Sequence, residues 1–267
     1  MSASLELAVA QFAPTDDAAR NLSVVGDLAR RAAARGAQLV VFPEYSSFFV
    51  DPFDASLARG AERLDGPFVE GLRALADDLA MTIVAGLVER TDGARVFNTV
   101  VAVDDTGLRA TYRKQHLYDA FGQRESDWVV PGPLEPAQIF RVAGISCGLM
   151  TCYDLRFPES ARLLVDAGAD LLLVPAEWVR GPLKEEHWQT LLAARAIENT
   201  VFVAAADHPP PIGVGRSCIL DPQGISLAAL GTTTGIVTAP IELAELERVR
   251  RVNPALALRR YGVSPRD

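Results

Sequence analysis

Three apolar segments of the sequence each lead to a side chain that can take part in acyl transfer. The segment 38–43 leads to Glu44, the segment 108–113 leads to Lys114, and the segment 144–151 leads to Cys152. A carboxylate can take the thiol proton, the thiolate can attack a carbonyl-type carbon, and an ammonium can stabilise the negative oxygen that forms. This combination of residue types predicts nucleophilic acyl transfer that needs no histidine.

Cys152 is the most informative of these residues. It ends a run that is typical of a buried strand, and residues 153–159 are typical of a turn that enters a helix. A thiol at such a junction lies beside the backbone N–H groups of the helix, so we expect the positive helix end to lower its pKa. Open α/β sheets also bind ligands at their strand ends. The functional site is therefore expected at this junction.

Strand and helix patterns alternate over nearly the whole chain. The ranges that predict strands are 5–12, 38–42, 82–89, 95–103, 108–113, 139–142, 144–152, 170–174, 201–205, 217–221 and 236–240. The ranges that predict helices are 18–34, 68–80, 158–167 and 184–198. Turns at 91–93 and 105–107 predict antiparallel hairpins. Such hairpins argue against a purely parallel sheet and favour an α/β protein with two mixed β-sheets face to face and helices outside.

Composition excludes several classes of protein. The chain has 267 residues, and 49% hydrophobic with 22% charged residues is typical of a globular protein. A net charge of -8 argues against nucleic acid or an anionic membrane as a partner. Three scattered cysteines make no disulfide framework, and no signal peptide or long apolar run is visible. We expect a cytoplasmic protein with one domain over 1–267, consisting of a core at about 5–242 and a tail at 243–267.

Three short motifs resemble those of a known family. The segments 42–44 (FPE), 112–117 (YRKQHL) and 151–159 (TCYDLRFPE) closely resemble motifs of the nitrilase superfamily of carbon–nitrogen hydrolases, in the same order. The resemblance runs from about residue 5 to residue 242. It implies a four-layer α-β-β-α sandwich that forms a homodimer or higher homo-oligomer, and we expect the helices around Arg162 and His187 to make the subunit contacts.

The resemblance also implies roles for individual residues. Cys152 would be the nucleophile, Glu44 the general base, and Lys114 the group that stabilises the tetrahedral intermediate. Glu125 matches a second family glutamate that precedes a Pro-Gly pair, and it would orient Lys114 or help proton transfer. The oxyanion hole would combine the Lys114 ammonium with the backbone N–H of Tyr153. No cofactor is expected.

Five further residues are expected near the substrate, namely Arg156, Glu177, Trp178, Phe121 and Trp128. Arg156 can pair with a substrate carboxylate, or it can form a salt bridge that shapes the turn after the nucleophile. Family members commonly have a small or apolar residue near Glu177, so an acid there is a departure. It would disfavour an anionic substrate, or it would bind an amine.

The histidines and the other two cysteines could indicate a papain-like or a metal-dependent enzyme. A papain-like enzyme needs a histidine beside Cys152, and the candidates are His116, His187 and His208. Each of these is expected to pack or to support a loop instead. The remaining cysteines, Cys147 and Cys218, are expected to be structural. No cluster of cysteine and histidine has the spacing of a metal site, so none is expected.

The favoured reaction is hydrolysis of a small aliphatic carboxamide to an acid and ammonia through a Cys152 thioester. The segment from Lys114 to Pro131 looks short beside omega-amidase-like relatives, which weakens an assignment to omega-amidase or deaminated glutathione amidase. If the protein is an enzyme of another activity, a nitrilase or an N-carbamoyl amino acid hydrolase is the alternative. A scaffold or regulatory protein without turnover is the alternative of another class. As an enzyme, the protein would have a small amide substrate and water as its small-molecule partners, with no nucleic acid or membrane partner, besides further copies of its own chain.

Overall fold

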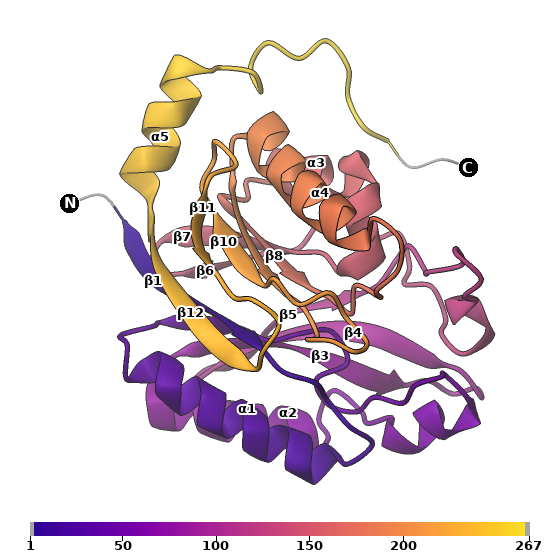
Figure 1. Cartoon of the computed structure of the whole chain (residues 1–267). Helices are drawn as coiled ribbons and strands as arrows, with labels where there is room; N and C mark the ends of the chain where they lie inside the picture. Colours follow the sequence, from indigo (N-terminus) through magenta and orange to yellow (C-terminus); the bar gives the residue numbers. More distant parts are fainter. Residues whose placement is uncertain (1–2, 265–267) are drawn as a thin grey trace.

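Two six-stranded mixed sheets lie face to face, with helices on both outer sides (Figure 1). The computed structural model describes residues 3–264 of the chain. The strand order is β12-β1-β2-β3-β4-β5 in the first sheet and β11-β10-β9-β8-β7-β6 in the second. The predicted four-layer α-β-β-α arrangement with two mixed sheets is confirmed.

The elements follow the predicted ranges closely. The first sheet consists of β12 (Gly235–Glu242), β1 (Ser4–Gln11), β2 (Leu39–Val41), β3 (Thr82–Arg90), β4 (Val96–Asp104) and β5 (Gly107–Arg113). The second consists of β11 (Ser226–Ala229), β10 (Cys218–Leu220), β9 (Phe202–Ala206), β8 (Leu171–Pro175), β7 (Ile145–Leu149) and β6 (Ile139–Val142). The α-helices are α1 (Ala18–Ala33), α2 (Pro67–Leu79), α3 (Pro158–Asp166), α4 (Lys184–Asn199) and α5 (Leu243–Val252). The described part of the chain also contains the 3-10 helices η1 (Ala55–Gly60), η2 (Glu125–Asp127) and η3 (Cys152–Arg156).

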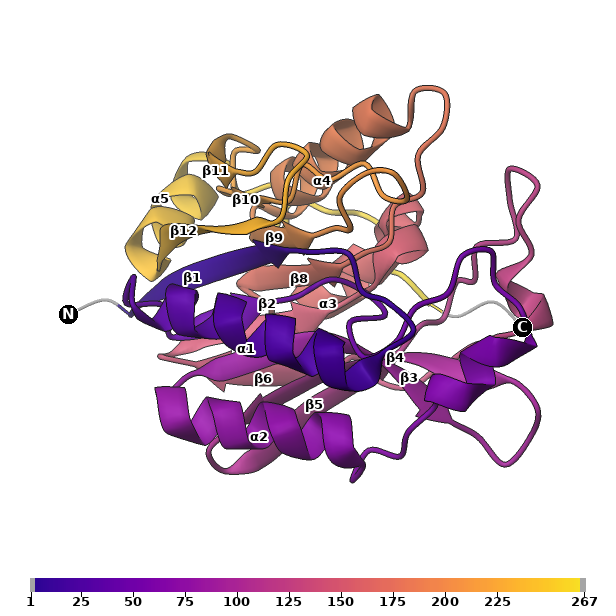
Figure 2. The same cartoon turned by 60° about the horizontal axis from the view of Figure 1, so that its bottom comes forward.

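Each sheet is apolar on both faces because it lies between two other layers. In β1, Leu7 and Val9 pack between the sheets, whereas Ala8 and Ala10 face the layer of α1 and α2. This is the period-two alternation of a strand, with both of its faces apolar. Figure 2 shows α1 and α2 side by side over the outer face of the first sheet. On the other side, Trp188 and other apolar residues of α3 and α4 cover the second sheet.

The strand that leads to the cysteine is shorter than predicted. β7 ends at Leu149, and Cys152 instead begins the five-residue η3, so that α3 starts only at Pro158. Cys152 has a φ of 47°, a left-handed backbone conformation that non-glycine residues seldom adopt. The chain therefore turns sharply at the thiol instead of running straight into the helix.

Two elements near the end of the chain were not predicted. β11 is an edge strand with mostly exposed residues, so it shows no apolar alternation. α5 is highly charged and buries only Leu246 and Val249. Leu246 belongs to the core between the two sheets, which is a long-range contact that a local pattern cannot reveal. Within residues 3–264, the structure contains no helix with both the length and the apolar character needed to span a membrane.

Candidate active site

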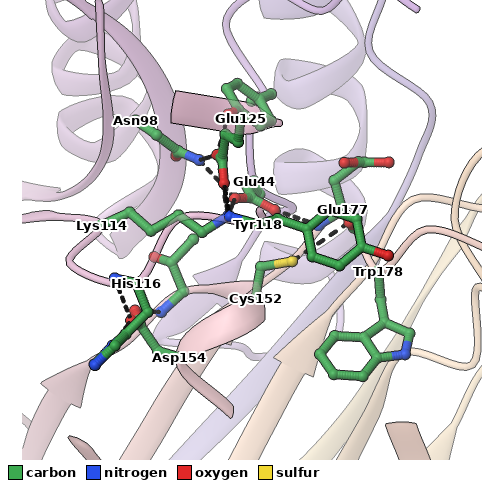
Figure 3. A network of polar contacts seen from close by, with 12 residues as sticks. Glu44, Asn98, Lys114, His116, Tyr118, Glu125, Cys152, Asp154, Glu177 and Trp178 are labelled. Atoms are coloured by element: carbon green, nitrogen blue, oxygen red, sulfur yellow. Dashed lines mark hydrogen bonds and ion pairs between the residues drawn. The ribbon is translucent and has the colours of Figure 1, made fainter. Parts of the chain in front are cut away.

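The residues singled out from the sequence come together where β2, β5 and β7 end, between the two sheets (Figure 3). Glu44 follows β2, Lys114 follows β5 directly, and Cys152 lies three residues past β7. Glu125 begins η2 in the loop that follows Lys114. Three strands from two sheets and one loop therefore supply the site.

The central feature is a buried ammonium between two carboxylates. Lys114 Nζ lies 2.9 Å from Glu44 Oε1 and 2.9 Å from Glu125 Oε2. The exposed fractions of these side chains are 2% for Lys114, 0% for Glu44 and 3% for Glu125. Since two carboxylates surround one ammonium, the cluster carries an excess negative charge when all three groups are ionised.

Backbone and amide donors fix the Glu44 carboxylate. The side chain of Asn98, from β4, donates to Glu44 Oε1 at 2.6 Å, and the backbone N–H of Glu177 donates to Oε2 at 2.6 Å. Gly86 in β3 allows the backbone of Glu44 to come close, because a Cβ there would lie 2.7 Å from the Glu44 carbonyl carbon and 2.3 Å from the nitrogen of Tyr45. The orientation of Glu44 therefore depends on three neighbouring strands or loops.

Glu125 accepts hydrogen bonds from a hydroxyl, a side-chain amide, a backbone N–H and the Lys114 ammonium. The Tyr45 hydroxyl donates to it at 2.7 Å, the Asn98 amide at 3.1 Å and the backbone N–H of Tyr118 at 2.6 Å. Together with Lys114, these donors satisfy both of its oxygens. Glu125 is thus a fixed part of the cluster, although the sequence places it in a charged loop.

The Cys152 thiol lies beside this cluster and donates a hydrogen bond to the backbone carbonyl of Glu177 at 3.4 Å. The N–H of the same residue holds Glu44. Glu177 is therefore the backbone link between the thiol and the carboxylate. Among residues 3–264, no direct hydrogen bond joins Cys152 to Glu44.

A cavity of about 400 Å³ opens onto the thiol. Lys114, Glu125, Cys152, Glu177 and Trp128 all contribute to its wall. Other parts of the wall come from the loops around Phe49, Pro52 and Pro211. Glu44 lies behind Lys114 and is fully buried. The cavity has the size of a site for a small molecule.

The remaining predicted residues lie beyond this cavity. Tyr153 and Trp178 line a smaller hollow next to Cys152, together with Lys184. Arg156 lines neither space, because its guanidinium packs against the rings of Trp178, Tyr153 and Phe121 and contacts His187 Nδ1 at 3.2 Å. Phe121 is 66% exposed and lies over this aromatic group.

Comparison with known proteins identifies the family. The model of the carbon-nitrogen hydrolase family matches residues 6–251. The chain belongs to this family. A deaminated glutathione amidase of Escherichia coli O157:H7 is 39% identical over 257 residues, which cover 96% of this chain and 97% of that protein.

Solved structures agree with this assignment. The NitFhit protein of C. elegans is 28% identical with a TM-score of 0.89, over 97% of this chain and 66% of that longer one. An amidase from Nesterenkonia sp. is 27% identical with a TM-score of 0.77, over 97% of this chain and 98% of the other. The protein is therefore an amidase-type carbon–nitrogen hydrolase, in a family whose enzymes use a cysteine nucleophile.

The thiol of this hydrolase is not acidified in the resting state. Burial, with the neighbouring Glu44 carboxylate, raises the pKa of Cys152 well above its usual value. The expectation that a helix end lowers this pKa is therefore wrong. Cys152 begins a single short 3-10 turn and does not adjoin α3, so the field of a long helix does not offset the cost of burying a thiolate. Reaction of this thiol needs a base.

The two carboxylates of the cluster have opposite pKa shifts. Burial raises the pKa of Glu44 above its usual value, more than Lys114 lowers it. Burial also acts to raise the pKa of Glu125, but Lys114 and the surrounding hydrogen-bond donors lower it below its usual value. Lys114 itself is disfavoured as a cation by burial, yet Glu125 and Glu44 raise its pKa well above normal. Glu44 is therefore the stronger base of the pair, and Lys114 stays an ammonium.

None of the three histidines donates to or accepts from Cys152 in the part of the chain that the structure describes. His116 contacts Asp154 at 2.7 Å, and His187 contacts Arg156. His208 is buried against the backbone carbonyl of Glu44 at 2.7 Å, and burial lowers its pKa to about 4. A papain-like pair is therefore not formed here. Residues 3–264 also contain no group of three or more histidine, cysteine, aspartate or glutamate side chains that could hold a metal ion.

Sequence reasoning missed three groups of the hydrolase that position the others. Asn98 joins the two carboxylates of the cluster. Asp154 is fully buried and accepts from the Tyr112 hydroxyl at 2.7 Å and from the backbone N–H of Thr151 at 3.0 Å. Lys184 lies beside the Tyr118 hydroxyl at 3.1 Å. The position of Asp154 two residues after the cysteine was visible in the sequence, but its partner Tyr112 comes from β5 of the other sheet.

Proposed function

We propose that this hydrolase cleaves a small aliphatic carboxamide to the acid and ammonia through a thioester on Cys152. The observation that carries the proposal is the convergence of the Lys114 ammonium, the basic Glu44 and the Cys152 thiol at one small-molecule cavity. The roles of Glu44, Lys114, Cys152, Glu125 and Tyr153 below belong to the same proposal.

In the first step, Glu44 accepts the thiol proton while the sulfur forms a bond to the amide carbon. The C=O electron pair moves onto the oxygen, and the Lys114 ammonium with the backbone N–H of Tyr153 stabilises the resulting negative charge. A base with a raised pKa suits this step, because its proton affinity is closer to that of the thiol. Glu125 keeps Lys114 in place through its own ion pair.

In the second step, the C–N bond breaks, and Glu44 returns the proton to the departing nitrogen, which leaves as ammonia. Water then attacks the thioester carbon while Glu44 takes one of its protons. The C–S bond breaks, Cys152 regains a proton, and the acid leaves. Every proton that Glu44 accepts is thereby returned within one turnover.

The resting contacts explain why substrate must enter before chemistry begins. The thiol donates to the carbonyl of Glu177, while Glu44 accepts from the N–H of the same residue. The thiol must therefore rotate toward Glu44 when a carbonyl occupies the cavity. Catalytic hydrogen bonds often form only in the substrate complex.

The decisive test is a panel of small aliphatic amides, nitriles and carbamoyl amino acids, scored for ammonia and for carbon dioxide. The panel includes deaminated glutathione, because the similarity to the Escherichia coli protein weighs against excluding that substrate on loop length alone. We expect ammonia from an amide and, by intact mass, an acyl adduct on Cys152. The Cys152→Ala protein should form no adduct and lose turnover at least about 10⁴-fold.

Other results would favour a different mechanism, a different reaction or a protein without turnover. Turnover by Cys152→Ala equal to that of the wild type would remove the thioester mechanism. Carbon dioxide together with ammonia would indicate carbamoyl cleavage, and activity on nitriles alone would indicate a nitrilase. A folded protein without adduct or turnover on the whole panel would favour a scaffold.

We also propose that the protein forms a homodimer through the outer faces of α3 and α4, where Arg162 and His187 were predicted to lie near the contact. Leu163 is 39% exposed and Ile197 is 50% exposed on these helices. Apolar residues exposed on an outer layer support an interface there. Sedimentation velocity at micromolar concentration should give a dimer, and a monomer would contradict the proposal.

A further inference from the structure

The Glu177 carboxyl group is a buried acid that the proposed chemistry does not use. Its backbone serves Glu44 and Cys152, but its side chain lines both the main cavity and the smaller hollow. Glu177 is only 8% exposed, and among residues 3–264 its carboxyl makes no hydrogen bond or ion pair. Figure 3 shows this side chain extending away from the cluster around Lys114. Its carboxyl oxygens remain open to the cavity, so a ligand that enters there can supply a partner.

The charges in the cavity wall indicate what that ligand carries. Each cation of the wall already has an acidic partner: Lys114 pairs with Glu125, Arg124 with Asp127, and Arg180 with Glu185. Two acids of the wall, Glu177 inside and Asp51 at the exposed edge, have no such partner within residues 3–264. The wall therefore holds more acidic than basic side chains, four against three.

We propose that Glu177 binds an ammonium group on the acyl part of the substrate, so that small amino-substituted carboxamides are preferred. This inference rests on the proposed amidase function and names its substrate class. Glu177 and Cys152 line the same cavity, so a short acyl chain can place its amide at the sulfur and its amine at the carboxyl.

The surroundings of Glu177 favour a cation over an anion. Burial, Glu44 and Asp207 raise the pKa of the Glu177 carboxyl well above its usual value, Lys114 lowers it, and Glu125 raises it. These neighbours and the burial disfavour the ionised form of the carboxyl in the empty cavity. When an ammonium binds, it favours the ionised carboxyl, which gives any proton that it carries to the solvent and forms an ion pair.

Lys184 is the cation that lines the smaller hollow together with Glu177, and aromatic rings already surround its ammonium. Its Nζ lies 4.7–4.9 Å from the ring centroids of Tyr118, Trp178 and Phe121 and 3.1 Å from the Tyr118 hydroxyl. Faces of aromatic rings stabilise a cation without an acid. An anionic substrate that bound Lys184 would have to enter a hollow with no room for a water molecule.

The test measures binding separately from chemistry. In the Cys152→Ala protein, calorimetry compares three amides of similar length: 4-aminobutanamide (cationic), pentanamide (neutral) and succinamate (anionic). We expect the cationic amide to bind about 10- to 100-fold more tightly than the neutral one, as a charged hydrogen bond in a buried site allows. Titrations in buffers with different ionisation enthalpies should show a net release of protons, because the ion pair favours the ionised carboxyl whose pKa is raised in the empty cavity.

Glu177→Gln in the same background is the diagnostic variant, because glutamine resembles the protonated acid and keeps the packing. It should remove both the preference for the cation and the proton release, while pentanamide binds within about threefold of before. Glu247→Gln, an exposed charge on α5, is the matched control and should change neither. Thermal melts establish that all variants are folded.

Several results overturn the inference. They are equal binding of the three amides, tighter binding of succinamate, a cation preference that survives Glu177→Gln, or no measurable binding of 4-aminobutanamide. Acyl adducts formed by the wild type report separately on the amidase function. Adducts without charge preference reject the inference alone, whereas Glu177-dependent amine binding without any adduct rejects the amidase mechanism alone.

Discussion

Replacing Glu125 with glutamine tests how the cluster controls its base. Oε1 of Glu125 accepts from Tyr45 and Asn98, and Oε2 accepts from the backbone of Tyr118 and from Lys114. Glutamine keeps the shape but offers one acceptor. Its amide nitrogen then faces at least two donors at the position of Oε2, namely the Tyr118 N–H and the Lys114 ammonium.

The two donors left without an acceptor determine how much stability the variant loses. A buried donor left without an acceptor costs about 1–3 kcal/mol, so we expect Glu125→Gln to lower the free energy of unfolding by roughly 2–6 kcal/mol. Because Lys114 loses one of its two anchors, its ammonium moves relative to the thiol. A displacement of about 1 Å in a reacting group can cost about 10²-fold, so a loss of that order in kcat is expected with a smaller change in KM.

The pH dependence distinguishes an effect on Glu44 from simple loss of structure. The base must be ionised, so kcat/KM of the wild type should rise with pH through the raised pKa of Glu44. The negative charge of Glu125 contributes to that raised pKa. Glu125→Gln removes this charge, and the acid limb of the kcat/KM profile should therefore move to lower pH.

The pH dependence of the free energy of unfolding provides a second, independent test of the role of Glu125. The pKa of Glu125 is lowered in the folded protein. The stability that its ionisation adds is therefore fully present above its ordinary pKa of 4.5 and is lost as the pH falls through the lower folded value. Urea unfolding should show a large difference between wild type and variant at neutral pH and a smaller one in acid.

Asp170→Asn is the control for loss of a negative charge far from the cluster. Asp170 precedes β8 at the end opposite Cys152, where it accepts from the N–H of Ser146 and lies 3.5 Å from Arg250. This variant should lose some stability and keep the acid limb in place. If Glu125→Gln left both kcat and the acid limb unchanged, the assigned coupling between Glu125, Lys114 and Glu44 would be refuted.

Two further variants probe elements that the sequence did not reveal. Asp154→Asn removes one acceptor from a buried residue that holds His116, Tyr112 and Thr151, so we expect kcat/KM to fall about 10-fold and the free energy of unfolding to fall by about 1–3 kcal/mol, measured by steady-state kinetics and urea titration. Unchanged kinetics would make Asp154 structural only. Leu246→Ala should lower the free energy of unfolding by about 2–5 kcal/mol with kcat nearly unchanged, because α5 anchors in the core far from the cavity. A stability equal to the wild type would show that α5 contributes little to that core.

Most secondary structure could be predicted because the two sheets are buried on both faces. Runs such as Leu171–Pro175 have the length and apolar character of strands inside a layered fold, and α1 has a clear apolar stripe. β11 and α5 were not predicted because each buries little of its own surface. The sharp turn of the backbone at Cys152 was not predicted either, since a single residue with positive φ leaves no local pattern.

The sequence by itself determined the layer architecture, the family resemblance and the residue types that gather at the strand ends, because periodicity and short motifs are local properties of the chain. Only the tertiary structure decided which groups share protons and charge. Asn98 and Asp154 receive their roles from partners 27–54 and 38–42 positions away. Burial, which depends on the whole fold, reversed the expected pKa shift of Cys152 and left the Glu177 carboxyl without a partner among the described residues.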